Sequence, residues 1–422
     1  MEIRLFHARI APFSGAETLF EGEVHVRGGR IAYVGPARSD AGAFDREIDC
    51  GGDVLLPGFK NAHSHAGMVF LRSLADDLPL DRWLHERVFP LEAKLTPDDL
   101  YALTRLAILE YLAGGVTAAF DMYYFREAVA AAAIDMGFRM CVTDGVNDFG
   151  GSAERAAAEY ERFNALHPLI SYRLAVHGEY TTGLPLLRDM AALAQEKKAP
   201  LFAHMNETRA EVDGCVARHG MRPFELFDSL GLFEHGGGGF HCVHVSENEM
   251  EIMAKRGLFA VTCPGSNLKL ASGVPPVYEL QKRGVRLAIG TDGPASNNAL
   301  DPFREMYLTA VLPKLAHGAD AVDALSVLEM AVKNGALAMG LCGCDSLKVG
   351  NNADIVRLDM QNPSMQPINH ALKNIVYSGS KQLVRMTMIA GNILYEDGEF
   401  RVGERAERIR AAAVRAAGRL LA

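Results

Sequence analysis

The chain has 422 residues, of which 49% are hydrophobic, and this is enough to bury the core of two or three domains or of one large barrel. Its net charge of -9 argues against nucleic acid as a partner. No apolar run approaches the roughly 20 residues that span a bilayer, and the first residues lack a secretory signal. The sequence therefore predicts a soluble, cytoplasmic protein with no membrane partner. The seven scattered cysteines indicate mostly buried thiols rather than a disulfide framework.

Both ends of the chain have the residue composition of β-strands. The first 55 residues contain IRLFHARI and EGEVHVRGGRIAYVGP, in which a Gly-Gly turn separates two runs of β-formers. The far end carries ADIVRLDM, KNIVYSGSK and VRMTMIAGNILYEDGEF. Because such hairpins are not stable alone, we expect the two ends to pair with each other. The last segment, ERAERIRAAAVRAAGRLLA, predicts an amphipathic helix that packs as a tail.

Between the two ends, short apolar runs alternate with longer helical patterns. There are eight such runs: VLLPGFKNAHSH, VTAAFDMYY, FRMCVTDGV, ISYRLAVHG, PLFAHMNE, GFHCVHV, FAVTCPG and VRLAIGTDG. Eight βα units in about 280 residues are typical of an α/β chain that forms a (β/α)8 barrel, with a doubly wound open sheet as the alternative. One helix start is explicit, since Thr96 offers an N-cap ahead of Pro97 and Asp99. The glycine run Gly236 to Gly239 predicts a flexible turn.

Chemistry in a barrel collects where the strands end. Alternate residues on a strand share a face, so His63 and His65 would both project into the barrel mouth. Three imidazoles and a carboxylate are a suitable ligand set for Zn²⁺ or another divalent metal such as Fe²⁺. The candidates at the ends of the first, fifth, sixth and eighth runs are His63, His65, His204, His241, His244 and Asp292.

Several stretches carry a specific resemblance. PGFKNAHSHAGM, LADDLPLDRWL, HMNET, HCVHVSENE, GSNLKLASG and GTDGPASNN resemble the amidohydrolase superfamily. Within it they are similar to the branch that deaminates 5'-substituted adenosines such as 5'-methylthioadenosine and S-adenosylhomocysteine. The resemblance implies a (β/α)8 TIM barrel of the metal-dependent hydrolase type over residues 58–345. It also implies a small β-sandwich made from residues 1–57 and 346–422, the C-terminal helix included.

The resemblance also implies roles for the strand-end residues. It implies that His63, His65, His204 and Asp292 hold one divalent metal, most simply Zn²⁺. One metal is expected because the fourth run ends in His177 rather than in a lysine that could be carbamylated. Catalysis would use Glu207 as the acid that protonates N1 of the adenine ring, His241 to hold the attacking hydroxide, and Asp292 to carry a proton to the departing amine.

Substrate contacts follow from the same resemblance. Trp83 would form an apolar wall, Glu92 would accept the ribose hydroxyls, His177 would donate to the purine, and Ser296 would lie near the metal. Family members that bind an amino-acid tail commonly have an arginine after the third strand, where this chain has Asp144. Arg155 is a possible substitute, although its sequence context is that of a solvated helix. The sequence therefore favours a nucleoside with a small or neutral 5' group.

Other functions remain open at this point. The same ligands would serve deamination of guanine, cytosine or a pterin, dechlorination of a triazine, or ring-amide hydrolysis. A non-catalytic metal-binding protein on an inherited barrel is the alternative outside enzymes. We expect a small-molecule nucleoside substrate and a homo-oligomer.

Overall fold

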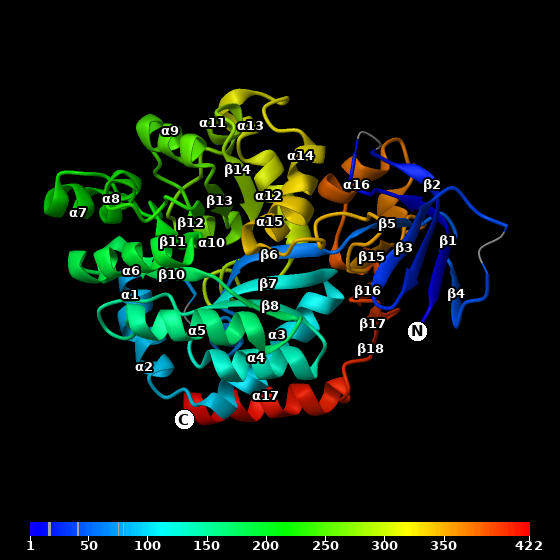
Figure 1. The fold of residues 1–422 in the computed structure, drawn as a ribbon, viewed down its shortest axis with the longest axis horizontal. Coiled ribbons are helices and arrows are strands. Elements are labelled where there is room, and N and C mark those ends of the chain that lie inside the picture. The colour runs from blue at the N-terminus through cyan, green and yellow to red at the C-terminus, as the bar shows by residue number, and fades with distance from the viewer. Residues whose placement is uncertain (16–17, 40–41, 75, 79) are drawn as a thin grey trace.

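The structure is a computed structural model that describes residues 1–15, 18–39, 42–74, 76–78 and 80–422. Ala75 and Pro79, both in the LADDLPLDRWL stretch quoted above, lie outside the described residues. A parallel barrel surrounded by helices occupies most of the molecule, and a sheet built from both chain ends lies beside it (Figure 1).

Each of the eight apolar runs contains or overlaps a barrel strand. The fourth strand is interrupted at Arg173 and is therefore written as two segments. The strands are β6 (Phe59–Ser64), β7 (Val116–Met122), β8 (Arg139–Thr143), β9 (Ile170–Tyr172) with β10 (Leu174–Gly178), β11 (Leu201–Met205), β12 (Gly237–His241), β13 (Phe259–Thr262) and β14 (Arg286–Ile289). Every strand pairing among them is parallel.

The sheet closes on itself. After β14, the backbone N–H groups of Thr291 and Asp292 donate to the carbonyl oxygen of His63 on β6, at 3.2 and 3.0 Å. This return contact distinguishes a barrel from an open doubly wound sheet and confirms the predicted (β/α)8 architecture. Aromatic side chains of Phe120, Phe202 and Phe240 fill the barrel interior. These rings pack in the barrel core beneath the residues at the strand ends, and Phe240 stacks on His63.

Helices surround the barrel and border its mouth. They are α1 (Leu80–Trp83), α2 (Phe89–Glu92), α3 (Pro97–Ala113), α4 (Arg126–Asp135), α5 (Ala153–Leu166), α6 (Leu184–Lys197), α7 (Arg209–His219), α8 (Pro223–Ser229), α9 (Glu247–Arg256), α10 (Pro264–Lys269), α11 (Val277–Lys282), α12 (Pro302–Val311), α13 (Lys314–His317), α14 (Ala324–Glu329) and α15 (Gly335–Met339). Shorter helical turns are η1 (Ala66–Leu71), η2 (Leu84–Val88), η3 (Glu179–Thr181) and η4 (Met330–Asn334). Helix α3 starts where the sequence predicts, with Thr96 and Asp99 in a reciprocal capping box.

The two chain ends form one nine-stranded sheet, in which β5 (Val54–Pro57) pairs with β15 (Ile355–Leu358). The sheet runs in the order β18-β17-β16-β15-β5-β1-β2-β3, with β4 beside β1. Its other strands are β1 (Ile3–Ile10), β2 (Phe20–Arg27), β3 (Arg30–Gly35), β4 (Arg46–Asp49), β16 (Val384–Ile389), β17 (Asn392–Glu396) and β18 (Glu399–Phe400). The pairing of the ends follows the sequence expectation, and the domain limits of 1–57, 58–345 and 346–422 stay a prediction.

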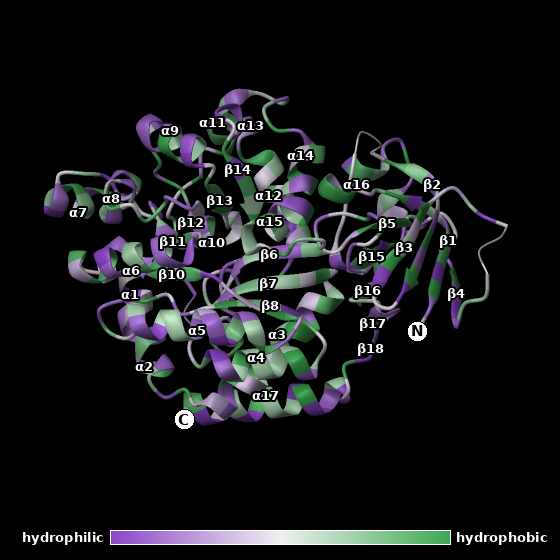
Figure 2. Cartoon of the chain, in the orientation of Figure 1, coloured by the Kyte–Doolittle hydropathy of each residue, from purple (hydrophilic) through white to green (hydrophobic). Residues whose placement is uncertain are grey.

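The C-terminal helix α17 (Ala406–Leu421) lies along α3, at the lower edge of the view in Figure 1. It buries Ile409, Ala413 and Leu420, and Arg419 at its end pairs with Asp99 of α3. Figure 2 shows both hydrophobic and hydrophilic residues along this helix, and the buried ones recur at the spacing of one helix face. The tail of the chain is thus a packed element of the barrel's outer layer.

Two local predictions were wrong. KNIVYSGSK does not form a strand, since α16 (Ala371–Tyr377) with the turns η5 (Pro363–Met365) and η6 (Lys381–Leu383) occupies this region. The buried residues of α16 include Leu372, Ile375 and Val376, whose three- and four-residue spacing is helical, and Leu372 precedes the apolar run on which the prediction depended.

The glycine run was predicted as a flexible turn, but Gly237, Gly238 and Gly239 belong to strand β12. A Cβ at Gly237 would lie 1.8 Å from the carbonyl oxygen of Leu201, and one at Gly238 would lie 2.4 Å from that of Phe259. Glycine is required here because the neighbouring strands approach too closely for a side chain.

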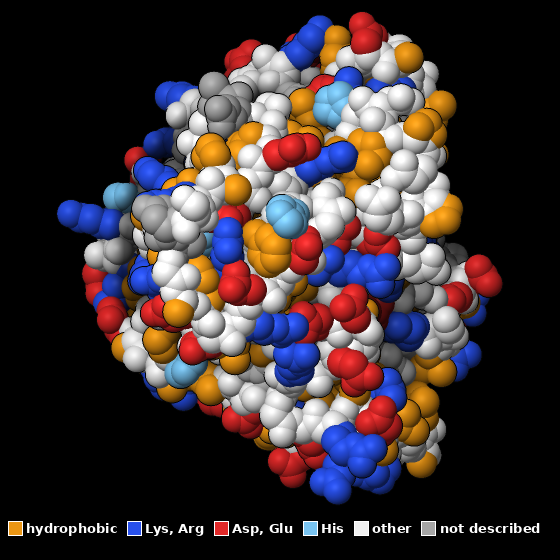
Figure 3. Space-filling model, turned by 90° about the vertical axis from the view of Figure 1, so that its right-hand side faces the viewer, with side chains coloured by type: hydrophobic (Ala, Val, Ile, Leu, Met, Phe, Trp, Pro, Cys, Tyr) orange, Lys and Arg blue, Asp and Glu red, His pale blue; other side chains and the backbone are white. Residues whose placement is uncertain are grey.

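Three features describe the surface and the membrane-crossing potential of the chain: the distribution of charge, the exposure of cysteines and the composition of the helices. On the face shown in Figure 3, basic and acidic side chains are interspersed. Of the seven cysteines, all within the described residues, Cys342 is exposed and the others are buried. None of the helices in the described part of the chain combines the length and the apolar composition needed to cross a bilayer.

Candidate active site and metal centre

The strand-end residues selected from the sequence meet at the mouth of the barrel. His63 lies on β6 and His65 directly follows it, His204 lies on β11, His241 ends β12, and Asp292 follows β14. Possible ligand atoms of His63, His204 and His241 lie within 4.8 Å of one another, as do those of His63, His65 and Asp292. His244, the remaining candidate, hydrogen-bonds the carbonyl oxygen of Ser272 instead.

Hydrogen bonds to the outer ring nitrogens orient three of these histidines. The Nδ1 atoms of His65 and His204 donate to the carbonyl oxygens of Met122 and His177, at 2.5 and 2.7 Å. Nδ1 of His241 lies 2.8 Å from Oδ1 of Asn267. Since each partner is an acceptor, a hydrogen lies on Nδ1, and in the neutral form of each ring the lone pair on Nε2 is directed inward. This is the arrangement that metal-binding histidines use.

His63 provides the test of whether a metal fits. Its ring is fully buried and stacks on Phe240 with 3.9 Å between ring centroids, and neither ring nitrogen has a hydrogen-bond partner in the described part of the chain. Its Nε2 lies 3.5 Å from Oδ1 of Asp292. A buried nitrogen without a partner is costly, and a cation bound at Nε2 would satisfy it. The residues present fit a divalent metal.

Asp292 is held in a defined orientation. Oδ1 lies 3.2 Å from Nε2 of His65, while Oδ2 accepts hydrogen bonds of 2.6 Å from the hydroxyls of Ser266 and Ser296. Its φ of +60° is rare for a residue other than glycine and is maintained by these contacts. Burial raises the pKa of this carboxyl, but the histidine contacts outweigh burial and hold it well below its usual range.

The imidazoles differ in protonation. Burial lowers the pKa of His63 to about 3, and burial together with the neighbouring imidazoles lowers that of His204 well below its usual value. Burial also acts to lower the pKa of His65, but Asp292 raises it to about 9. A metal ligand must be deprotonated, so metal binding between His65 and Asp292 would release this proton.

Glu207 lies in the turn between β11 and α7, beside the histidines. Its Oε2 is 3.7 Å from Nε2 of His241, and its Oε1 is 3.5 Å from the Ser272 hydroxyl. Burial raises the pKa of Glu207, which favours the protonated carboxyl that a general acid needs.

A cavity of about 170 Å³ opens onto this cluster. It is lined by all four predicted substrate residues: Trp83, Glu92, His177 and Ser296. Glu92 accepts a 2.6 Å hydrogen bond from the Tyr123 hydroxyl, and burial raises its pKa to about 7. Within the described residues, the buried indole N–H of Trp83 has no hydrogen-bond partner.

Sequence reasoning missed residues that support or line the site. Ser266 and Asn267 orient Asp292 and His241, and both belong to the GSNLKLASG stretch after the seventh strand. Their place after a strand end was the signal that could have found them. Tyr123, Tyr124 and Tyr180 also line the cavity.

Asp144 lines the same cavity and forms two ion pairs. Its carboxylate oxygens lie 2.6 Å from Nη1 of Arg126 and 2.5 Å from Nη2 of Arg155. Arg126 also binds Glu159 through two hydrogen bonds of 2.7 Å. Arg155, considered above as a substitute for the missing arginine, is therefore already paired with a carboxylate.

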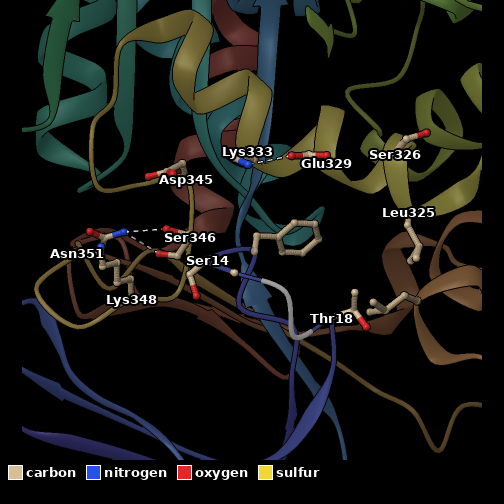
Figure 4. A pocket seen from close by; sticks show the side chains of 13 residues that line it. Ser14, Thr18, Leu325, Ser326, Glu329, Lys333, Asp345, Ser346, Lys348 and Asn351 are labelled. Atoms are coloured by element: carbon tan, nitrogen blue, oxygen red, sulfur yellow. Dashed lines mark hydrogen bonds and ion pairs between the residues drawn. The ribbon is translucent and has the colours of Figure 1, made fainter. Parts of the chain in front are cut away.

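A larger hollow, of about 650 Å³, lies between helix α14 and the terminal sheet (Figure 4). Its Lys333 pairs with Glu329 at 2.9 Å, and its Asn351 donates to Ser346. The lining includes none of the residues predicted for the site. We assign the chemistry to the smaller cavity because the histidine cluster is there.

The comparisons with known proteins agree with this assignment. The amidohydrolase family model matches residues 54–394. The chain is 40% identical over 403 residues to the 5-methylthioadenosine/S-adenosylhomocysteine deaminase of Syntrophobacter fumaroxidans, covering 92% of each chain. It is 42% identical over 386 residues to the protein of the same name in Desulfovibrio desulfuricans, covering 89% of this chain and 88% of that one.

Solved structures are also similar. An adenosine deaminase from Xanthomonas campestris with bound zinc superposes with a TM-score of 0.93 at 35% identity, covering 100% of this chain and 98% of that one. A triazine hydrolase variant, at a TM-score of 0.90 and 21% identity with 99% of both chains covered, shows the fold alone. The barrel, its histidine cluster and these matches establish that the chain belongs to the amidohydrolase family.

Proposed function

We propose that this protein hydrolytically deaminates adenosine-type nucleosides, giving the inosine analogue and ammonia. Candidate substrates are 5'-methylthioadenosine, 5'-deoxyadenosine, adenosine and S-adenosylhomocysteine. The observation that carries the proposal is the buried Glu207 carboxyl beside a histidine cluster, at the base of a cavity that also contains Glu92. The names of the similar proteins support the same activity.

The site suits one divalent metal, which we propose is zinc. His63, His65, His204 and Asp292 would hold it, with three neutral imidazoles and one carboxylate as ligands. When bound, zinc lowers the pKa of coordinated water towards 7, which supplies hydroxide at neutral pH. Metal analysis of the purified protein should find one equivalent per chain, and the identity of that metal distinguishes zinc from iron.

The chain's own residues would move the protons. Oxygen adds to C6 of the adenine ring, and protonated Glu207 donates to N1, so that the ring accepts the electron pair. Asp292 takes one proton of the attacking water and passes it to the exocyclic amine, after which the C6–N bond breaks and ammonia leaves. The proton remaining on the added oxygen returns to the Glu207 carboxylate, which leaves a carbonyl at C6 and restores the acid. His241, fixed by Asn267, lies between Glu207 and the other histidines, where it can stabilise the tetrahedral centre.

The remainder of the cavity would bind the nucleoside. Trp83 offers an apolar wall, His177 a ring nitrogen for the purine, and Glu92 an acceptor for the ribose hydroxyls. Ser296 contacts Asp292 directly and would act beside the reacting atoms.

Asp144 bears on the choice of 5' group. A substrate carboxylate would be repelled by the carboxylate of Asp144, and both nearby arginines already pair with acidic side chains. We therefore expect small or neutral 5' groups, as in adenosine, 5'-deoxyadenosine and 5'-methylthioadenosine, to be preferred over S-adenosylhomocysteine.

The test is ammonia release by zinc-loaded protein from these four nucleosides, guanine and cytosine. Turnover of the nucleosides, with a loss of at least a thousandfold in Glu207→Gln at unchanged zinc content, is the expected result. Turnover of guanine or cytosine instead, or equal rates in the variant, would contradict the proposal. Triazine, pterin and ring-amide substrates would then be examined.

A further inference from the structure

We propose that Glu211 is the positioning residue that fixes Glu207 for proton donation. This inference rests on the proposed function, in which Glu207 is the acid. Glu211 lies in the first turn of α7 and does not line the cavity, so it acts through Glu207 and not on the substrate.

The contacts of Glu211 converge on one turn of the backbone. Its Oε1 accepts the backbone N–H of Asn206, and its Oε2 accepts that of Glu207, each at 2.7 Å. Its own N–H donates to the hydroxyl of Thr208, the N-cap of α7, at 3.1 Å. The carboxylate thereby joins the end of the metal-binding strand β11 to the start of α7.

This turn has a conformation that needs support. Asn206 has a φ of +54°, which is uncommon for a residue other than glycine. Its side-chain amide donates to both carboxylate oxygens of Glu249, at 2.9 and 3.0 Å. Asn206 is therefore held on its backbone by Glu211 and on its side chain by Glu249.

The Glu207 carboxyl, by contrast, is weakly held. Its hydrogen-bond and ion-pair contacts in the described part of the chain are the Ser272 hydroxyl at 3.5 Å and His241 at 3.7 Å. Such a carboxyl remains available to a substrate, but its position then depends on its backbone. The carbonyl oxygen of Asn206 accepts the N–H groups of Val243 and His244, at 3.1 and 2.8 Å. The N–H groups of Asn206 and Glu207 both donate to Glu211, which therefore holds the donor side of this turn.

The burial of Glu211 is not explained by an ion pair. Glu249 of the same region pairs with Arg222, whereas Glu211 forms no ion pair with any described residue. Removing a carboxylate from water costs free energy, and hydrogen bonds to the backbone of one turn offset only part of that cost. Stability of the fold therefore does not explain why Glu211 is buried here. Its role, we infer, is to orient the backbone that carries Glu207.

The experiment compares Glu211→Gln with the wild type as full-length, zinc-loaded protein. Glutamine keeps the shape of the side chain, but its amide group has only one oxygen. Its nitrogen would face one of the two backbone N–H groups, and because both are donors that hydrogen bond would be lost. With 5'-methylthioadenosine or adenosine as substrate, we expect kcat to fall 10- to 100-fold, with KM within threefold of wild type and one zinc retained. Hydrogen exchange at residues 205–208 should quicken at least tenfold.

A double-mutant cycle separates positioning from general destabilisation. In the Glu207→Gln background, Glu211→Gln should change kcat less than twofold, because the group that it positions is already absent. Glu23→Gln serves as the control: Glu23 is also a buried glutamate that accepts a backbone N–H, but it lies in the terminal sheet and additionally pairs with Arg4. This control should leave kcat and KM unchanged.

Three results would overturn the inference: kcat of Glu211→Gln within twofold of wild type, a full multiplicative loss in the Glu207→Gln background, or unchanged exchange at residues 205–208. Failure of the proposed function gives a different pattern, in which the wild type releases no ammonia from any nucleoside. In that case, faster hydrogen exchange at residues 205–208 in Glu211→Gln would still show that Glu211 holds this turn, independently of any deaminase activity.

Discussion

Glu92 is the residue whose ionisation should be visible in substrate binding. Burial raises its pKa to about 7, and the Tyr123 hydroxyl occupies only one of its oxygens. An acid is protonated below its pKa, so the fraction of carboxylate falls as the pH decreases from 8 to 6. If ribose hydroxyls donate to this carboxylate, KM should rise up to about tenfold per pH unit below 7.

Steady-state kinetics across that range provide the measurement. Glu92→Gln should show a higher KM that no longer varies with pH, since glutamine does not ionise. The same pH dependence of KM in wild type and variant would remove Glu92 as the ribose acceptor.

At the scale of elements, helix α3 depends on its N-terminal cap. The hydroxyl of Thr96 accepts the N–H of Asp99, and the Asp99 carboxylate accepts the N–H of Thr96. Thr96→Ala should lower the free energy of unfolding by about 1 kcal/mol. Because exposed Thr96 does not line the cavity, kcat should not change.

Urea denaturation followed by circular dichroism measures this effect, and Thr96→Ser, which keeps the hydroxyl, is the matched control. Equal stability of the alanine variant and the wild type would mean that α17, through Arg419 and Asp99, maintains this helix start without the cap.

At the scale of the whole molecule, a buried ion pair joins the barrel to the terminal sheet. Arg139 begins β8, and its Nε and Nη2 donate to the carboxylate of Asp354, at 2.9 and 3.1 Å. Asp354 precedes β15 and also accepts the N–H of Ala390. Arg139→Met would leave a buried carboxylate without its cation, and we expect a loss of about 3–5 kcal/mol.

Differential scanning calorimetry should show a lower Tm for Arg139→Met. Adding Asp354→Asn to this variant should recover part of the loss, because the carboxylate that lost its arginine is then replaced by a neutral amide. A double variant less stable than Arg139→Met would show that the backbone contact of Asp354, rather than the ion pair, joins the two parts. The expected homo-oligomer stays a prediction at this scale.

Much of the barrel, and the cluster of histidines at its mouth, could be predicted from local pattern. Strands buried on both faces leave continuous apolar runs, and the two-residue period places His63 and His65 on one face. Parallel strands of one barrel end at the same rim, so His204, His241 and Asp292 had to approach them. These features are encoded by residues close together in the chain.

Other features were decided by tertiary structure, because they depend on contacts between distant residues. Packing of Leu372, Ile375 and Val376 made α16 a helix, although the apolar run alone favoured a strand. The closeness of neighbouring strands required the glycines of β12. The pairing of Arg155 with Asp144 depends on where a helix lies relative to a strand end. The sequence by itself determined the barrel and the histidines and aspartate that end its strands, while the tertiary structure decided which charges are paired, because pairing depends on distances in space that no local period encodes.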